Sequence, residues 1–237
     1  MQNDDMKQRM ENYERIIREI LGAFSKLEFH IVVESTVQKK VIPVNKNEER
    51  EKLLLEDIGT IVNDFAVEYS RTPITFELYK SLLKTPRPKS FRNNEVGMFA
   101  DKVIPSFFAK NKDKLKIVDS FERLPLMGYP DEKITDKYGR VTYLEVKATS
   151  RRNVGSPRDF FFSPLTNSKR KITEDGHHLL LCFDTLEQKE KEFIITGWCL
   201  IDLFGLKVSM KPEFNADNLE LYRQDHVLLE VDLRKEE

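Results

Sequence analysis

Two carboxylates and a lysine are grouped around one short apolar segment of the chain. Asp131 follows a Gly128-Tyr129-Pro130 turn sequence, and Glu145 and Lys147 lie within the apolar run 141–148. That run is rich in β-branched and aromatic residues, which predicts a strand. Because side chains alternate along a strand, Glu145 and Lys147 are expected on one face and their apolar neighbours on the other. Burying such charges is costly unless they pair or bind a metal ion.

A hairpin can bring the two carboxylates together. A proline biases the residue before it towards an extended conformation, so a strand is expected from Asp131 to Thr135, with a turn at 136–140. Two carboxylates suit Mg²⁺, which uses few protein ligands and keeps several waters. A lysine beside that ion can act as a point charge for a phosphate oxygen or for an attacking water. These residue types indicate metal-dependent hydrolysis of a phosphodiester.

Residues 130–147 resemble the PD-(D/E)xK nuclease superfamily, whose largest biochemical group is the type II restriction endonucleases. The resemblance implies that Asp131 and Glu145 bind Mg²⁺ and that the backbone carbonyl of Val146 is a further ligand. It also implies that Lys147 orients or helps to deprotonate the attacking water. Many relatives carry another carboxylate on an upstream helix, and Glu95 is the candidate here. An acidic residue in a first helical turn also simply complements the helix dipole, so both interpretations of Glu95 stand.

Simpler interpretations of the motif also exist. A Glu-x-Lys pair on a strand is often solvated, and Pro-Asp is an ordinary turn sequence. Glu132 and Asp136 are nearby carboxylates that can replace Asp131 as a ligand, although solvated turn residues are the expected role of both.

A basic segment follows the predicted catalytic strand and is the expected DNA-contacting region. Arginine and asparagine suit guanine and adenine edges, and lysine suits phosphates. The alternative is that its phenylalanines are core and its basic residues form a solvated helix face. Adjacent His177 and His178 cannot both face one ion from a strand, so a structural role is expected for them. The candidate DNA-binding residues are Arg151, Arg152, Arg158, Asn167, Lys169, Arg170 and Lys171.

Composition sets the limits on fold and location. The 237 residues suffice for one substantial α/β domain with a small appendage. A formal net charge of −1 neither supports nor excludes nucleic-acid binding, because such binding depends more on whether the basic residues are clustered. Cys182 and Cys199 lie in apolar runs and are expected to be reduced core residues of a cytoplasmic protein. No secretion signal or long apolar span is recognised, so no membrane association is expected.

The expected fold is α/β, with a restriction-endonuclease-like core. A mixed sheet of about five strands is expected to be flanked by helices on both faces. Residues 1–90 are expected to form a mainly helical region for dimerisation or support of DNA contacts, and residues 91–237 the catalytic core. Helices are predicted at 6–24, 45–69, 72–84 and 95–108, and strands at 27–33, 115–124, 131–135, 141–148, 178–183 and 193–203.

The first predicted helix carries one apolar stripe with alternating spacings of four and three residues, as in a coiled-coil seam. Packing on its own domain is the expected use, with a dimer contact as the alternative. The stripe consists of Met6, Met10, Tyr13, Ile17, Ile20 and Phe24.

Other catalytic motifs do not appear in the sequence. Its 9 glycines form no phosphate-binding loop, and neither serine nor cysteine occurs in a recognisable nucleophile motif. The resemblance therefore implies a Mg²⁺-dependent homodimer that cuts double-stranded DNA at a specific sequence, and a cognate methyltransferase. The alternatives are a structure-specific nuclease of repair, recombination or defence, a catalytically inactive DNA-binding module and, more distantly, an RNA-binding protein.

Overall fold

The computed structural model describes residues 2–23, 26–82, 91–125, 128–150, 162–164 and 171–210, together with Arg223 and Asp225. It divides the chain into two compact units. One comprises Met1–Lys26 and Val208–Glu237, and the other comprises Leu27–Lys207. The predicted boundary near residue 90 falls inside the second unit.

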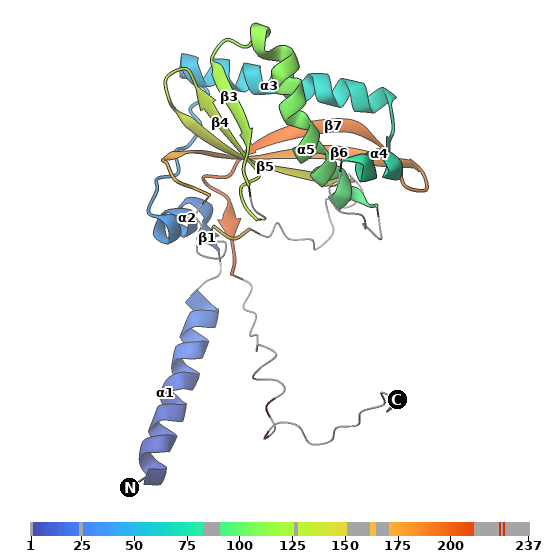
Figure 1. The fold of residues 1–237 in the computed structure, drawn as a ribbon. Coiled ribbons are helices and arrows are strands. Elements are labelled where there is room, and N and C mark those ends of the chain that lie inside the picture. The colour runs from blue at the N-terminus through green and yellow to red at the C-terminus, as the bar shows by residue number, and fades with distance from the viewer. Residues whose placement is uncertain are drawn as a thin grey trace, which may run out of the picture. The chain divides into compact units, whose positions relative to one another are not determined.

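A six-stranded mixed sheet forms the centre of the Leu27–Lys207 unit (Figure 1). Its spatial order is β2-β7-β6-β5-β4-β3, in which β5 and β6 are parallel and all other neighbours are antiparallel. The predicted mixed sheet is confirmed, with one more strand than expected. The strands are β2 (Ile74–Thr75), β3 (Val118–Arg123), β4 (Glu132–Asp136), β5 (Val141–Thr149), β6 (Gly176–Lys189) and β7 (Glu192–Asp202).

Helices α3 (Glu49–Arg71) and α5 (Asn93–Asn111) cover one face of this sheet (Figure 1). Their apolar positions recur at helical spacing, so each helix turns one stripe towards the strands. Phe65 of α3 and Phe99 of α5 share a core with Leu144 and Val146 of β5. The predicted apolar face of the strand at 141–148 is therefore confirmed. A single turn of 3-10 helix, η1 (Lys112–Lys114), links α5 to the strand that follows it.

Helix α2 (Phe29–Val37) lies on the other side of the sheet (Figure 1). The prediction of a strand at 27–33 is wrong, because only β1 (Leu27–Glu28) is extended there. Phe29, Val33 and Val37 are fully buried, whereas Ile31, which a strand would place on the same face, is 47% exposed, so the buried positions follow a helix. A short sheet pairs β1 with β8 (Lys207–Val208).

The short helix α4 (Phe76–Ser81) begins later than the sequence predicts. Thr72 does not begin the next helix but closes the end of α3. The hydroxyl of Thr75 caps α4 instead, accepting the Leu78 N–H at 3.1 Å. The chain between α4 and α5 lies largely outside the described residues.

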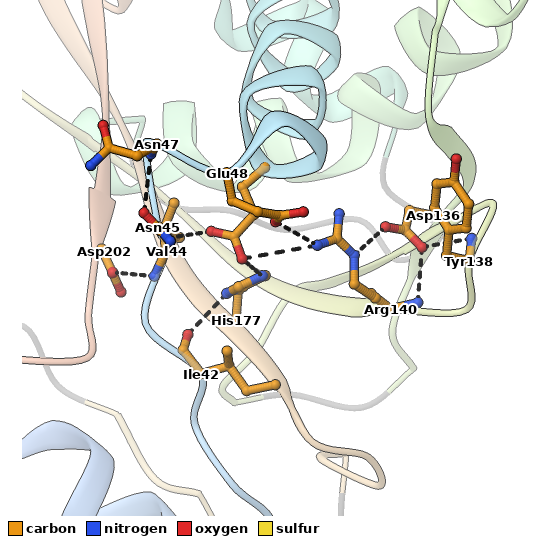
Figure 2. Close-up of polar contacts among 11 residues, drawn as sticks. Ile42, Val44, Asn45, Asn47, Glu48, Asp136, Tyr138, Arg140, His177 and Asp202 are labelled. Atoms are coloured by element: carbon orange, nitrogen blue, oxygen red, sulfur yellow. Dashed lines mark hydrogen bonds and ion pairs between the residues drawn. The ribbon is translucent and has the colours of Figure 1, made fainter.

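A network of ion pairs fixes the β4–β5 hairpin to the start of α3 (Figure 2). The Arg140 guanidinium lies 2.6 Å from an Asp136 carboxylate oxygen and 3.2 Å from one of Glu48. The other Asp136 oxygen accepts the N–H groups of Tyr138 and Arg140, both at 2.9 Å. Asp136 is 3% exposed, so the expectation of a solvated turn residue is wrong. It closes the hairpin turn, where Gly139 has a φ of 78°.

The two histidines of β6 point to opposite sides of the sheet. His177 Nδ1 lies 2.9 Å from the Ile42 carbonyl oxygen (Figure 2), and its Nε2 lies 3.4 Å from Glu51. The ring of His178 instead meets Tyr129, whose hydroxyl is 2.5 Å from His178 Nδ1. Burial lowers the pKa of His178 to about 3, so this ring is neutral. Both histidines serve the fold, as expected.

The cysteines face one another across β6 and β7. Cys182 is half-buried and Cys199 is exposed, so the prediction that both are core residues is wrong. Both alternate with residues that pack under α3 and α5, and they therefore lie on the less covered face of the sheet. Both are free thiols.

Helix α1 (Gln2–Ala23) belongs to the other compact unit. The helix is confirmed, and Phe24 lies outside the described residues. No helix within the described ranges has the length and apolar character needed to cross a bilayer. The exposed apolar side chains of α1 include those of the stripe, Met6 (62%), Met10 (59%), Tyr13 (61%), Ile17 (43%) and Ile20 (43%), and also Ile16 (38%).

Candidate active site

The β4–β5 hairpin brings Asp131 against the middle of β5. The Asp131 N–H donates to the Leu144 carbonyl oxygen at 3.1 Å. In return, an Asp131 carboxylate oxygen accepts the Val146 N–H at 2.9 Å. These two bonds hold the carboxylate beside the backbone that carries Glu145, as the sequence predicts.

Glu145 and Lys147 share one face of β5. The Lys147 ammonium donates to Glu145 Oε1, which confirms the predicted same-face arrangement. The Lys147 side chain is 45% exposed and that of Glu145 only 4%, so the lysine lies at the rim and the carboxylate below it. Glu145 Oε2 is buried and has no hydrogen-bond partner within the part of the chain that the structure describes.

Burial disfavours the charged forms of both carboxyl groups, and negative neighbours add to it: Asp131 at Glu145, and Asp101 at Asp131. Burial raises the pKa of Glu145 to about 7, with a further contribution from the negative charge of Asp131. Burial also raises the pKa of Asp131, against the stabilising hydrogen bond from Val146. Lys147 and Lys171 oppose these shifts through their positive charges. A divalent cation between the carboxylates would remove the repulsion and satisfy the free Glu145 oxygen.

The donor set fits a magnesium ion. Asp131 and Glu145 offer hard oxygen ligands, and Mg²⁺ needs only one or two carboxylates because it retains water. The described residues contain no group of three His, Cys, Asp or Glu side chains arranged as a metal cage. The geometry therefore favours a sparsely coordinated ion over a closed structural site.

Helix α5 approaches β5 closely at Lys147. A Cβ atom built on Gly97 would lie 3.1 Å from the Ala148 backbone nitrogen and 3.5 Å from the Lys147 Cα. An alanine here would force the two backbones apart by a few tenths of an ångström, so the glycine allows this approach without strain. The close approach fixes the distance between α5 and the end of the candidate site.

Glu95 lies in the first turn of α5. Its carboxylate accepts the Arg92 N–H at 2.8 Å, forming a capping box, and lies 3.5 Å from the Arg92 guanidinium. These contacts stabilise the helix start. A catalytic role for Glu95 remains a prediction.

A buried acidic cluster beneath Asp131 was not anticipated. Arg123 forms a two-pronged pair with Asp101 of α5, with a shortest distance of 2.7 Å. Glu132 is fully buried beside Asp101; its oxygens meet no N–H or hydroxyl donor among the described residues, and a protonated Glu132 would donate to the Asp101 carboxylate. Burial and the charge of Asp101 raise the pKa of Glu132 to about 10, so it is protonated at neutral pH.

The expectation that Glu132 is a solvated turn residue is therefore wrong. Glu132, Ile134 and Asp136 alternate along β4, and all three are buried. This period of two, centred on an isoleucine, was the available signal that Glu132 faces the interior.

The basic segment is described only at its end. Lys171 is buried, with 8% of its surface exposed, and its ammonium donates to backbone carbonyls. Burial lowers its pKa. Six candidate DNA-binding residues lie outside the described residues: Arg151, Arg152, Arg158, Asn167, Lys169 and Arg170.

Comparison with known proteins identifies the family. The model of the type II restriction enzyme MjaV family matches residues 23–225. The chain belongs to this family. Type II restriction enzyme MjaV of Methanocaldococcus jannaschii is 30% identical over 237 residues, covering 97% of this chain and 100% of that protein. Type II restriction enzymes are site-specific deoxyribonucleases, and the family assignment places this chain among them. No solved structure matches the chain significantly.

Proposed function

We propose that this family member is a Mg²⁺-dependent endonuclease that cuts double-stranded DNA at a specific sequence. The observation that carries the proposal is the buried Glu145 carboxylate, whose Oε2 has no partner in the described chain while Asp131 lies beside it. A buried carboxylate oxygen that accepts no hydrogen bond is unfavourable unless a cation completes its surroundings. Lys147 on the same face provides the third group of the PD-(D/E)xK pattern.

Each residue has a distinct part in the proposed reaction. Asp131, Glu145 and the Val146 carbonyl would hold the ion. When bound, Mg²⁺ polarises the scissile phosphate and stabilises the leaving oxygen. Lys147 lies at the rim with 45% of its side chain exposed, so its ammonium can reach a water or a phosphate oxygen. Glu95 is retained as a further candidate at the start of α5.

The proposed DNA contacts come from the basic segment after β5. The segment begins four residues after Lys147 in the sequence, which supports a role at the same phosphate backbone. Its arginines and asparagine supply base contacts and its lysines supply phosphate contacts. The residues proposed are Arg151, Arg152, Arg158, Asn167, Lys169 and Arg170.

The proposed active form is a homodimer. Cutting both strands of a palindromic site requires two active sites related by a twofold axis. The exposed stripe of α1 is the proposed contact, because its coiled-coil spacing suits a second copy of the same helix. Arg9 and Glu14 flank the stripe at positions that bring opposite charges together between two parallel helices. A restriction enzyme in the cytoplasm also implies a methyltransferase that protects the host's own sites.

Digestion of a long unmethylated plasmid tests the proposal. Purified protein with Mg²⁺ is expected to give discrete fragments, and EDTA is expected to abolish them. Mapping the fragment ends then gives the recognition sequence. Preferential cutting of branched or single-stranded DNA would instead favour a structure-specific nuclease. Binding without any cleavage would favour an inactive DNA-binding module.

A further inference from the structure

Lys171 has surroundings unlike those of a lysine that contacts DNA. Its ammonium donates to the Gly128 carbonyl at 2.6 Å and to the Pro130 carbonyl at 2.7 Å. The residue is only 8% exposed. Burying a lysine is costly, and the two carbonyls compensate by replacing water around the charge. The position is therefore an interior one, fixed by two specific hydrogen bonds.

The two carbonyls belong to the turn that delivers Asp131. Gly128 has a φ of 91°, a conformation that favours glycine, and Pro130 immediately precedes Asp131. The carbonyl groups of Gly128 and Pro130 therefore both accept from the Lys171 ammonium. Lys171 thereby fixes the backbone on the incoming side of Asp131.

Asp131 itself is held against β5. Its N–H bonds to Leu144 and its carboxylate to the Val146 N–H. Without Lys171, the turn would keep these contacts but would lose the common donor of its two carbonyls. The expected consequence is a displaced Asp131 carboxylate in a protein that is still folded.

The charges around Lys171 fit a role within the site. Asp131, Glu145 and Asp101 attract its ammonium, and Arg123 repels it. Three negative groups thus face one buried cation next to the proposed metal ligands. Lys171 lowers the repulsion between Asp131 and Glu145 while no metal ion is bound.

We infer that Lys171 is a positioning residue, which holds the Gly128–Asp131 turn so that the Asp131 carboxylate meets the metal ion together with Glu145. This role rests on the proposed function and replaces the direct DNA contact that the basic segment suggested for Lys171. Lys171, the last basic residue of that segment, therefore has a role different from the DNA contact proposed for its neighbours.

Two substitutions at Lys171 and one control separate positioning from DNA contact. Lys171→Met keeps the length of the side chain but removes its donors, and Lys171→Arg keeps the charge with a different shape. Lys169→Met is the matched control, because Lys169 is proposed to contact phosphate. Folding is compared by circular dichroism and Tm. DNA affinity is measured without divalent cation over a range of salt, and cleavage is measured at saturating DNA.

The positioning role predicts a loss in the cleavage step rather than in DNA affinity. In Lys171→Met, we expect single-turnover cleavage to fall about 100-fold, since misplacement by about 1 Å has that effect. Its DNA affinity and salt dependence are expected to match the wild type. Lys169→Met is expected instead to weaken DNA binding, with a salt slope smaller by about 1. Lys171→Arg is expected to fold and to retain more activity than Lys171→Met.

A second readout keeps this inference separate from the proposed function. The Mg²⁺ concentration that gives half of the maximal rise in Tm is expected to increase about tenfold in Lys171→Met. This increase corresponds to a loss of about 1.4 kcal/mol in the free energy of Mg²⁺ binding. If the wild type binds Mg²⁺ but cuts no DNA, the proposed function fails while this readout still tests Lys171. Unchanged Mg²⁺ binding in both folded variants would overturn the inference. Weaker DNA binding of Lys171→Met, together with a reduced salt slope and a normal cleavage rate, would also overturn it.

Discussion

The carboxylate of Asp131 accepts the backbone N–H of Val146 at 2.9 Å. Val146 lies between Glu145 and Lys147 in the sequence, so this one bond ties Asp131 to the strand that carries the other two groups. The three proposed site residues therefore depend on a single pair of neighbouring strands, β4 and β5. Any change that separates these strands is expected to affect all three together.

The contact of α5 with β5 gives the first prediction. Gly97→Ala would place a methyl group 3.1 Å from the Ala148 nitrogen, where only backbone movement can make room. We expect destabilisation by about 1–3 kcal/mol, typical of overpacking, and a slower cleavage rate because the end of β5 moves. Chemical denaturation and single-turnover cleavage measure the two effects.

Gly59→Ala is the matched control for Gly97→Ala. Gly59 is also within a helix, but the nearest atom to its added Cβ is 4.0 Å away. This substitution is expected to stabilise the protein by about 0.5–1 kcal/mol, because alanine loses less conformational entropy in a helix. Equal effects at the two glycines would contradict the close approach of α5 to the site.

The raised pKa of Glu145 gives a pH dependence of stability. Its pKa rises from 4.5 to about 7 on folding, so the folded state binds more protons between these values. The stabilisation of the folded state by this protonation of Glu145 is fully present below about pH 4.5 and is lost as the pH rises through about 7. In EDTA, the Tm of the wild type is therefore expected to fall over this window relative to that of Glu145→Gln. Scanning calorimetry at several pH values measures the difference between the two proteins.

Magnesium is expected to reverse the fall in the Tm of the wild type at higher pH. Metal binding requires deprotonated carboxylates, so the rise in Tm caused by Mg²⁺ is expected to grow between pH 5 and 8. Glu145→Gln is expected to show little rise at any pH. Parallel Tm profiles for the two proteins, with and without Mg²⁺, would show that Glu145 is not the titrating ligand.

The sequence predicted most of the sheet because its strands are apolar runs with clear periods. It also predicted the Asp131–Glu145 pair, since a hairpin with a five-residue turn leaves few other arrangements. The strand at 27–33 was mispredicted because Ile31, Val32 and Val33 favour strands locally. Tertiary packing of Phe29, Val33 and Val37 outweighed that preference.

The polar interior was harder to predict than the sheet. Glu132 and Lys171 belong to residue types that are almost never fully buried, so sequence reasoning placed them at the surface. Their burial depends on distant partners: Asp101 lies beside Glu132, and two carbonyls of the 128–130 turn bind Lys171. Such long-range pairs leave no local periodicity in the sequence.

The exposed stripe of α1 gives a prediction about assembly. Ile17→Glu places a charge in the middle of the proposed seam and is expected to shift a dimer towards monomer. Sedimentation equilibrium measures the change, and Asn12→Glu outside the stripe is the control. A dimer of unchanged affinity in Ile17→Glu would place the dimer contact elsewhere on the chain.

Two neighbouring buried carboxyl groups allow the central claim to be tested directly. The claim is that Asp131, Glu145 and Lys147 form the cleavage site, with Glu145 as a ligand and Glu132 as a protonated interior group. The measurement is single-turnover cleavage of one mapped DNA site by the wild type, Glu145→Gln and Glu132→Gln at equal Mg²⁺. We expect Glu145→Gln to lose about 100-fold or more, equivalent to several kcal/mol of transition-state stabilisation. Glu132→Gln is expected to stay within a few-fold of the wild type, because glutamine resembles a protonated glutamate. Normal cleavage by Glu145→Gln, or an equal loss in Glu132→Gln, would contradict the account.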